Sequence, residues 1–401
     1  MQKLFPVTGI YKHYHWGSQN GLCEIIGIEN QSEKPIAEIW YGAHPSSPSQ
    51  VLTETGEVSM GEVFGRHPEI FSSHGSEKKS PAHLPVMMKF LSAAAPLSLQ
   101  VHPDKSFAEK GYDKENQSNI AIDAPERNYR DRSSKPESLL ALSDFYALRG
   151  FHTYPEIISN LEKFCPVSLK KDIEKFSVNQ TEEGLKTLLV RLLDPRTDDR
   201  HEIITEALSN GEKYTETDPA AQWITKLHRF YPEDTALLAP AFLNLIHLKP
   251  GDAFSISPGI MHCYLQGTGI EIMTLSDNVL RGGLTSKHRD LDELLKITDF
   301  TPTAKRYFST DTGYVQTELP AETGDYRAEK IAFESVQGRI LLKANRGPSM
   351  FLAVKGACTI RTLQGESREM KPGDCILTGS NLGFVTLEGS ATLVMTTVPE
   401  D

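Results

Sequence analysis

The chain has 401 residues and a formal net charge of -11, from 42 Lys and Arg against 53 Asp and Glu. Nucleic acids and anionic membrane surfaces are recognised by clustered basic residues, so this balance disfavours both as the main partner. We expect two or three domains, because a single hydrophobic core rarely grows to this length. Pro6 and Gly9 interrupt the N-terminal stretch, and no apolar run reaches the roughly 18 residues that a membrane helix needs.

The first part of the chain, up to about residue 150, consists of short apolar runs separated by Gly, Pro, Ser and Asn, as in IAEIWYGAHP and PLSLQVHPD. This pattern predicts strands and loops. One helix is expected within it, because Pro103 ends a strand and Asp104 can then cap a helix that starts in SFAEKGY.

The pattern changes between about residues 155 and 242, where YPEIISNLEKF, EEGLKTLLVRLL and AAQWITKLHRFY place apolar residues at helical spacing. A helical segment inserted between two β-rich segments is therefore predicted. After Leu248 the β pattern returns, and LDELLKI is the longest run with helical periodicity.

A short repeat lies in this last part: HLKPGDAFSISPGIMHCY, residues 247–264, resembles REMKPGDCILTGSNLGFV, residues 368–385. Each copy predicts a strand, a tight Pro-Gly turn and a second strand. Such units are typical of double-stranded β-helix barrels, which favours two barrels, although K-P-G-D alone is also a common turn sequence. Alignment on the turn places Phe384 where the first copy has His262, so only the first unit would bind a ligand through that position.

The strand PLSLQVH has its apolar residues on one face and Ser98, Gln100 and His102 on the other. Inside a barrel these polar groups need partners, which indicates a ligand or metal site, whereas in a half-exposed strand they would simply face water. Two further motifs add donors: SSKPES contains Glu137, and GIMHCYLQGTGIEIM contains His262. Imidazole nitrogen and carboxylate oxygen suit zinc, but the spacing alone is a weak signal because no H-E-x-x-H or C-x-x-C motif occurs.

Five cysteines are scattered through the chain without a C-x-x-C pair. This distribution predicts neither a disulfide framework nor a thiolate metal site. A reducing compartment suits such a chain, and we expect it to be cytoplasmic.

The motifs together resemble the type I mannose-6-phosphate isomerase (phosphomannose isomerase) family over essentially the whole chain. The matching segments are WGS (16–18), AEIWYGAHP (37–45), PLSLQVHPDK (96–105), KPE (135–137) and HCYLQGTGIEIMTLSDNVLRGGLTSKHRD (262–290). The resemblance implies a mainly β fold with a helical insertion: a catalytic cupin barrel, of the double-stranded β-helix or jelly-roll type, and a second C-terminal cupin-like barrel. The implied domains are a catalytic cupin domain formed by 1–152 and 243–305, a helical insertion domain at 153–242, and a C-terminal domain without a metal site at 306–401.

The resemblance also implies one zinc ion per chain and a set of site residues. The zinc ligands correspond to Gln100, His102, Glu137 and His262. Catalytic residues correspond to Arg281, Glu271, Lys135 and Asp277. Substrate or phosphate contacts correspond to Trp16, Ser98, Lys89 and Lys287, and Tyr264, which shares a strand face with His262, is expected to join them.

The implied activity is the interconversion of mannose 6-phosphate and fructose 6-phosphate by proton transfer through an enediol(ate). A metal with an open position could polarise the carbonyl, and Arg281 could add a fixed positive charge. For the base, Glu271, Asp277 and Lys135 are candidates. Glu271 is favoured and would reach the site if its strand turned back through Gln-Gly-Thr-Gly, although it could instead orient a ligand histidine.

One departure from the family pattern concerns the residues before K-P-E, where many bacterial members have Asn-His and this chain has Ser133 and Ser134. A mechanism that requires this histidine cannot operate here. The alternative function is therefore a non-catalytic cupin that binds a sugar phosphate. An iron-dependent oxygenase is less attractive, because a glutamine ligand departs from the two-His-one-carboxylate pattern. The expected partner is a small sugar phosphate, without nucleic acid or membrane, and the expected state is a monomer.

Overall fold

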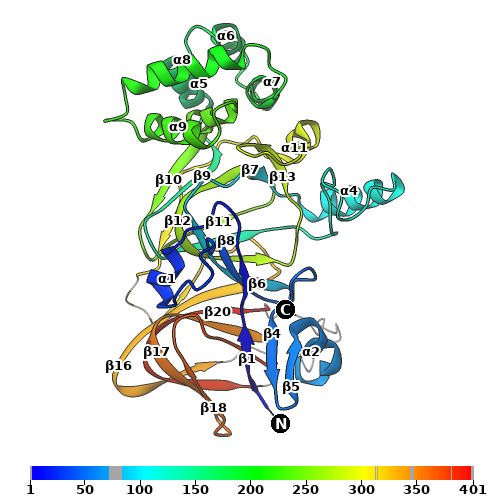
Figure 1. The fold of residues 1–401 in the computed structure, drawn as a ribbon, viewed down its shortest axis with the longest axis vertical. Helices are drawn as coiled ribbons and strands as arrows, with labels where there is room; N and C mark the ends of the chain where they lie inside the picture. The colour runs from blue at the N-terminus through cyan, green and yellow to red at the C-terminus, as the bar shows by residue number, and fades with distance from the viewer. Residues whose placement is uncertain are drawn as a thin grey trace.

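The structure is a computed structural model that describes residues 2–71, 84–311, 313, 315–343, 347–380 and 382–398. Within these residues the chain forms two open antiparallel sheets and a group of helices. Figure 1 shows the helices α5 to α9 at one end of an elongated molecule, the first sheet in the middle and the second sheet at the other end. The fold is therefore mainly β with a helical segment, as predicted.

The first sheet has eleven strands, and β12 runs through its centre. Its strands are β2 (Ile10–Lys12), β3 (Glu38–Tyr41), β6 (Val86–Ala93), β7 (Leu99–Val101), β8 (Glu137–Ala141), β9 (Phe145–Phe151), β10 (Leu243–Leu248), β11 (Asp252–Ile256), β12 (His262–Thr274), β13 (Leu280–Gly283) and β14 (Phe308–Ser309). The first half of β12 pairs with β7 and β9, and its second half pairs with β6 and β8. This change of neighbours brings strands from both parts of the sheet to one place.

The expectation that β12 turns back before Glu271 is wrong. The strand continues through Gly267, which has φ +133° and would place a Cβ 2.6 Å from the carbonyl oxygen of Asp144. Glycine is needed here because the neighbouring backbone approaches closely, not because the chain reverses.

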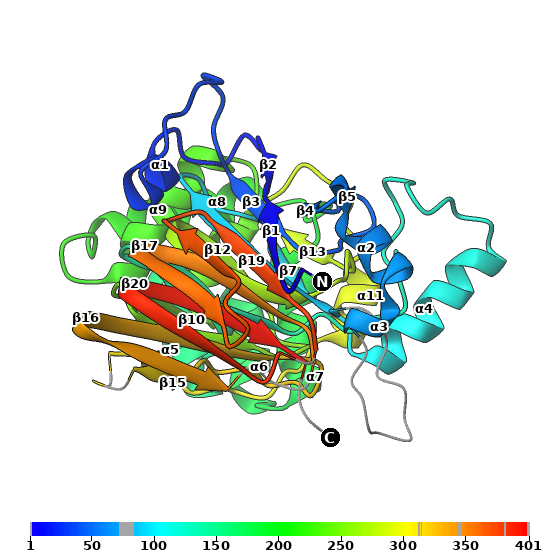
Figure 2. The same ribbon diagram turned by 90° about the horizontal axis from the view of Figure 1, so that it is seen from below.

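The second sheet has nine strands: β1 (Leu4–Thr8), β4 (Gln50–Thr53), β5 (Gly56–Ser59), β15 (Gln316–Glu318), β16 (Arg327–Lys343), β17 (Ser349–Thr362), β18 (Ser367–Met370), β19 (Cys375–Thr378) and β20 (Phe384–Thr397). β1 pairs with β19 and with β4, so three strands from the N-terminal part of the chain complete the C-terminal sheet. Figure 2 shows β1 beside β19 from below. Local sequence patterns carry no information on such a distant partner, and the sequence did not predict it.

The two K-P-G-D segments form the same turn. In each copy the lysine N–H donates to the aspartate Oδ2 at 2.9 Å, and the aspartate N–H donates to the lysine carbonyl at 2.9 Å. Gly251 and Gly373 have φ of +93° and +91°, a conformation that favours glycine. The repeated turn predicted from the sequence is thus present in both sheets.

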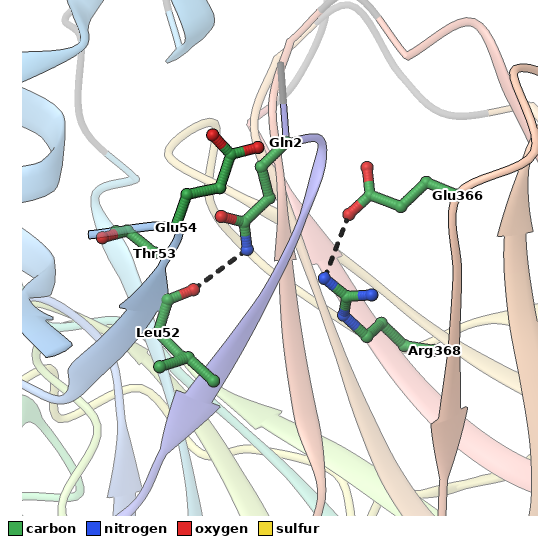
Figure 3. A pocket seen from close by; sticks show the side chains of 6 residues that line it. All are labelled: Gln2, Leu52, Thr53, Glu54, Glu366 and Arg368. Carbon is green, nitrogen blue, oxygen red and sulfur yellow. Dashed lines mark hydrogen bonds and ion pairs between the residues drawn. The ribbon is translucent and has the colours of Figure 1, made fainter. Parts of the chain in front are cut away.

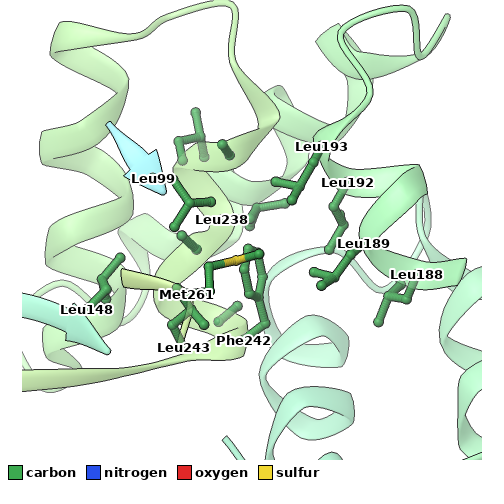
Figure 4. Packing of buried hydrophobic residues seen from close by; sticks show 14 of the residues in the cluster. Leu99, Leu148, Leu188, Leu189, Leu192, Leu193, Leu238, Phe242, Leu243 and Met261 are labelled. Carbon is green, nitrogen blue, oxygen red and sulfur yellow. The ribbon is translucent and has the colours of Figure 1, made fainter. Parts of the chain in front are cut away.

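The helical segment between β9 and β10 is confirmed. It contains α5 (Tyr154–Phe164), α6 (Lys170–Val178), α7 (Glu182–Leu193), α8 (Arg200–Glu212), α9 (Pro219–Phe230), η1 (Thr235–Leu238) and α10 (Ala239–Phe242). Their buried leucines pack against Leu99 and Leu148 of the first sheet, and against Met261 just before β12, in one continuous core (Figure 4). Burial of each such side chain stabilises the fold by about 1.5–3 kcal/mol, so the helices are fixed to this face of the sheet.

In the N-terminal part, the described residues form four helices: α1 (Gly21–Ile26), α2 (Met60–Arg66), α3 (Pro68–Phe71) and α4 (Lys105–Gln117). Only α4 was predicted, and the Asp104 side chain caps it by accepting from Phe107 N at 2.7 Å. The other three are too short for helical periodicity to stand out in a sequence. Later in the chain, α11 (Leu291–Ile297) coincides with LDELLKI.

All five cysteines are free, in agreement with the prediction that no disulfide framework exists. Among the described residues, no helix combines the length and apolar character needed to cross a membrane.

Candidate metal centre and active site

His102, Glu137 and His262 meet inside the first sheet, with one ligand atom of each within 4.8 Å of the others. His102 follows β7, Glu137 begins β8 and His262 begins β12. Strand pairing brings them together, because β12 pairs with both β7 and β8. All three are at most 1% exposed. In the described part of the chain, this is the only such group of three His, Cys, Asp or Glu residues.

The hydrogen bonds of the two imidazoles fix their tautomers. His102 Nδ1 lies 2.8 Å from the Asn278 carbonyl and His262 Nδ1 lies 2.9 Å from the Ile260 carbonyl. A carbonyl only accepts, so each Nδ1 carries the proton and each Nε2 presents a lone pair. Burial lowers the pKa of both imidazoles, that of His102 to about 3 with a contribution from Lys135, which keeps both rings neutral.

The two lone pairs face the same carboxylate: His102 Nε2 is 3.1 Å from Glu137 Oε1, and His262 Nε2 is 3.7 Å from Glu137 Oε2. Glu137 Oε1 is buried and accepts no well-directed hydrogen bond, although Lys135 Nζ lies 3.0 Å away. Acceptors that face one another repel unless a cation lies between them. The donor set therefore fits a divalent metal that takes nitrogen and oxygen ligands.

Gln100 adds a fourth group to this cluster. Its Nε2 lies 3.2 Å from His262 Nε2, and its Oε1 accepts from Ser98 Oγ at 3.3 Å. The two ends of an amide have nearly the same shape, so exchange of the two would turn Oε1 toward the cluster. Gln100 can thus act as an oxygen ligand without a change of backbone.

The cluster adjoins a cavity of about 830 Å³. Two of the predicted site residues, His102 and His262, are buried beside this cavity. All the others line it: Trp16, Lys89, Ser98, Gln100, Lys135, Glu137, Tyr264, Glu271, Asp277, Arg281 and Lys287. Residues from distant parts of the chain are thus collected around one space.

Lys89 and Glu271 lie opposite each other on β6 and β12, and their side chains form a buried ion pair of 2.8 Å. Glu38 Oε1 is 3.9 Å from the same Nζ, and Glu38 Oε2 accepts from Trp40 Nε1 at 2.8 Å. Burial raises the pKa of Glu271, and Lys89 opposes this shift. For Lys89, burial opposes the charged form but the two carboxylates outweigh it and raise its pKa. Lys89 is therefore already neutralised by protein carboxylates.

Lys135 and Tyr264 contact Glu137 from two sides. Lys135 Nζ is 3.0 Å from Glu137 Oε1 and 3.4 Å from His102 Nε2, and Tyr264 donates its hydroxyl to Glu137 Oε2 at 3.1 Å. Burial opposes ionisation of Glu137, but Lys135 and the neighbouring His102 and His262 together outweigh burial and lower the pKa of that carboxyl. Glu137 is thus ionised and fixed in place.

Asp277 pairs with His44 Nε2 at 3.3 Å. Burial opposes ionisation of Asp277, but the contact with His44, together with Lys135 and Lys89, outweighs burial and lowers the pKa of the carboxyl. Ser133 and Ser134 support the segment around Asp277 through their backbone carbonyls, which accept from Asn278 Nδ2 at 2.9 Å and from Thr274 Oγ1 at 2.7 Å. Neither serine lines the cavity. The two serines that replace the family's Asn-His thus lie in a segment that supports the backbone around Asp277 and does not itself line the cavity.

Three cationic side chains line the cavity without an ion pair to any residue that the structure describes: Arg130, Arg281 and Lys287. We call them the cation group. Burial and Arg130 lower the pKa of Arg281, and burial, Arg281 and Arg130 lower that of Lys287, because like charges disfavour one another. Sequence reasoning missed Arg130, which lies outside every motif that was recognised and carries no signal beyond its charge.

Comparisons with known proteins agree with this geometry. The family model described as phosphomannose isomerase type I, catalytic domain, matches residues 4–154. The mannose-6-phosphate isomerase of Escherichia coli strain K12 is 33% identical over 399 residues, which cover 98% of each chain. The human mannose-6-phosphate isomerase is 26% identical and covers 94% of this chain and 99% of its own.

Solved structures are similar over the full length. A mutant phosphomannose isomerase from Salmonella typhimurium has a TM-score of 0.90 at 28% identity, and a zinc-bound mannose 6-phosphate isomerase has 0.89 at 29%. Both comparisons cover 100% of each chain.

Proposed function

Because the chain belongs to the type I phosphomannose isomerase family, we propose that it interconverts mannose 6-phosphate and fructose 6-phosphate with one zinc ion per chain. The ligands would be Gln100, His102, Glu137 and His262. The observation that carries this proposal is the convergence of two imidazole lone pairs on the buried Glu137 carboxylate, beside a cavity that the cation group also lines.

A bound zinc ion would supply a Lewis acid that polarises the sugar carbonyl. The two imidazoles, the carboxylate and the amide would leave a position open for a substrate oxygen. Tyr264 and Lys135 hold Glu137 from both sides, which keeps the carboxylate directed at the cluster. Lys135 and Arg281 would stabilise the negative charge that develops on the sugar oxygens.

In the forward reaction a proton leaves carbon 2 of the open-chain aldose and is delivered to carbon 1, while the hydroxyl proton on oxygen 2 passes to oxygen 1. Glu271 is the proposed base, because it lines the cavity and burial raises its pKa toward the range in which a carboxylate both accepts and returns a proton. Lys89 would then regulate the charge on Glu271. Asp277 is the second candidate, but its ionised form is stabilised by His44, which makes it a weaker base.

The substrate phosphate needs free cations and hydroxyl donors. Lys89 was expected to contribute, but its ammonium group is already paired with Glu271 and Glu38. We therefore assign phosphate binding mainly to the cation group, with Ser98 as a hydroxyl donor. Trp16, which stacks on Tyr14 at 5.6 Å, would cover one face of the sugar.

The test is an isomerase assay on metal-free protein and on the same protein reconstituted with zinc. Zinc-loaded protein is expected to interconvert the two sugar phosphates and to exchange the carbon-2 proton with D2O. Folded, zinc-loaded protein without turnover would overturn the proposal, and binding of mannose 6-phosphate without exchange would instead favour a non-catalytic sugar-phosphate-binding protein.

The base is tested with Glu271→Gln, whose exchange rate is expected to fall by about 10²–10⁴ with zinc content unchanged. Glu38→Gln is the matched control, because it removes the other carboxylate near Lys89 and leaves the proposed base intact. An equal loss of the exchange rate in both variants would show that the effect comes from the lost pairing with Lys89. It would then argue against Glu271 as the base.

We also propose that each sheet curves into a cupin-type barrel, although strand pairing among the described residues does not close it. The chain would then divide into a catalytic unit (1–152 with 243–305), a helical insertion (153–242) and a C-terminal unit without a metal site (306–401). The K-P-G-D turns in both sheets and the helices between β9 and β10 support this division. Strand pairing adds one change: β1, β4 and β5 belong with the C-terminal unit.

We further propose a monomer in the cytoplasm. Five free cysteines, four of them buried, support a reducing compartment. Light scattering on purified protein tests the monomer, and a dimer mass would contradict it.

A further inference from the structure

One wall of the cavity is built from two segments that are distant in the sequence. Residues 230–234 comprise the last residue of α9 and its connection to η1, and residues 284–289 follow β13. The second segment carries Lys287 of the cation group. Residues from both segments line the cavity, so their relative position determines the shape of this wall.

The carboxylate of Asp234 joins the two segments. Its Oδ2 accepts from Leu284 N at 2.8 Å, and its Oδ1 accepts from Ala236 N at 3.0 Å. The Arg289 guanidinium binds both oxygens, with Nη1 3.3 Å from Oδ1 and Nη2 on Oδ2. One buried carboxylate therefore holds both ends of the turn Leu284–Arg289.

Inside that turn the restraint reaches Lys287 through Thr285. Arg289 Nη2 donates to the Thr285 carbonyl at 3.0 Å, and Lys287 N donates to Thr285 Oγ1 at 3.1 Å. The backbone of Lys287 is thus connected to Asp234 by consecutive hydrogen bonds.

The turn requires such a restraint because its backbone and charges are unfavourable. Leu284 has φ +53°, a left-handed conformation that leucine rarely adopts. Gly283 fits tightly against η1, since a Cβ there would lie 2.2 Å from the Ala236 Cβ. Lys287 also experiences repulsion from Arg130 and Arg281.

We propose that Asp234 is a positioning residue that, through Arg289, holds Lys287 toward the phosphate group of the substrate. The helical segment would then set substrate affinity without touching the reacting atoms. This inference rests on the proposed function, because it assigns the cation group to the phosphate.

The decisive variant is Asp234→Asn, which retains one oxygen for Leu284 N or Ala236 N but removes the charge that binds Arg289. The KM for mannose 6-phosphate and the inhibition constant of inorganic phosphate are both expected to rise about tenfold, with kcat changed less than about threefold. In a Lys287→Ala background, Asp234→Asn is expected to add less than about twofold, because both changes remove the same contact.

Asp218→Asn is the matched control. Asp218 also accepts from a helix N-terminus, at Ala220 N, and also pairs with a cation, Lys163, at 2.8 Å, but it lies outside the cavity lining. In Asp218→Asn, the KM for mannose 6-phosphate and the inhibition constant of inorganic phosphate are expected to stay within about twofold of the wild-type values.

An unchanged KM in Asp234→Asn, an additive effect with Lys287→Ala, or an equal rise of KM in Asp218→Asn would each overturn the inference. Failure of the proposed function can be distinguished from failure of this inference, because the zinc-loaded wild-type protein would then show no turnover. Phosphate binding, measured by calorimetry on wild type and Asp234→Asn, would still report on the position of Lys287 in that case, and equal affinities would overturn the inference.

Discussion

The two sheets contain the same turn but place different residues at the start of the strand after it. K-P-G-D closes with the same hydrogen bonds in both, and β12 and β20 begin at aligned positions. His262 at the start of β12 is fully buried and faces Glu137, whereas Phe384 at the start of β20 is 38% exposed. The comparison teaches that a backbone repeat carries chemistry only where neighbouring strands supply side chains that complete the site.

The charged groups around the hollows of the two sheets differ as well. A hollow of about 470 Å³ in the second sheet is lined by Gln2, Leu52, Thr53, Glu54, Glu366 and Arg368 (Figure 3). There Arg368 pairs with Glu366 at 3.4 Å, and Glu366 also accepts from Lys3 N at 2.8 Å. Glu366 also accepts from Leu4 N of β1 at 3.3 Å, so protein groups already satisfy its charge. The cation group beside the first sheet has no such partner among the described residues, so an anionic ligand can bind to it.

The largest effect is expected at the aligned positions that begin β12 and β20. His262→Ala should lose zinc and reduce kcat/KM by more than the roughly 10–100-fold that loss of an outer hydrogen-bond partner costs. Phe384→Ala, the matched change in the second sheet, should leave zinc content and kcat/KM unchanged. Metal analysis and steady-state kinetics on both variants measure this, and a zinc loss in Phe384→Ala would break the comparison.

A smaller effect is expected from the buried lysines. Lys89→Met leaves the carboxylates of Glu271 and Glu38 buried without the cation that pairs with them, which should destabilise the fold by about 3–5 kcal/mol. Lys330→Met in the second sheet should cost about 1 kcal/mol or less, because its partner Asp311 is 71% exposed and stays hydrated. Denaturant unfolding of both variants checks the difference, and equal costs would contradict it.

The same lysine variant has a pH signature. Lys89 opposes the rise in the pKa of Glu271 that burial causes, so its removal raises that pKa further. If Glu271 must be ionised to act as the base, activity is lost as pH falls through its pKa. The acid limb of the kcat–pH profile should therefore move to higher pH in Lys89→Met, and an unmoved limb would argue against Glu271 as the base.

The smallest effect concerns the repeated turn. Gly251→Ala and Gly373→Ala should each destabilise by about 1–2 kcal/mol, because both glycines have left-handed φ. Neither variant should alter KM, because neither residue lines the cavity. Calorimetric Tm values and kinetics test this, and a KM change in Gly251→Ala alone would mean that the first turn also shapes the site.

Much of the site could be predicted from single strands. Alternation in PLSLQVH separated Gln100 and His102 from their apolar neighbours, and the structure places those apolar neighbours in the core. Helical spacing likewise predicted the helical segment that contains α5 to α9. By contrast, the pairing of β1 with β19 joins Leu4 to Thr378, and no local pattern specifies a partner at that distance.

The sequence by itself determined which side chains share a face and which segments are helical, because both depend on backbone periodicity within a few residues. It also supplied the motifs that resemble a family. Only the tertiary structure decided that Lys89 is neutralised by Glu271, that Arg130 joins Arg281 and Lys287, and that Asp234 restrains the turn that carries Lys287. These contacts depend on strand register and burial, which position charges from distant segments within a few ångströms of one another.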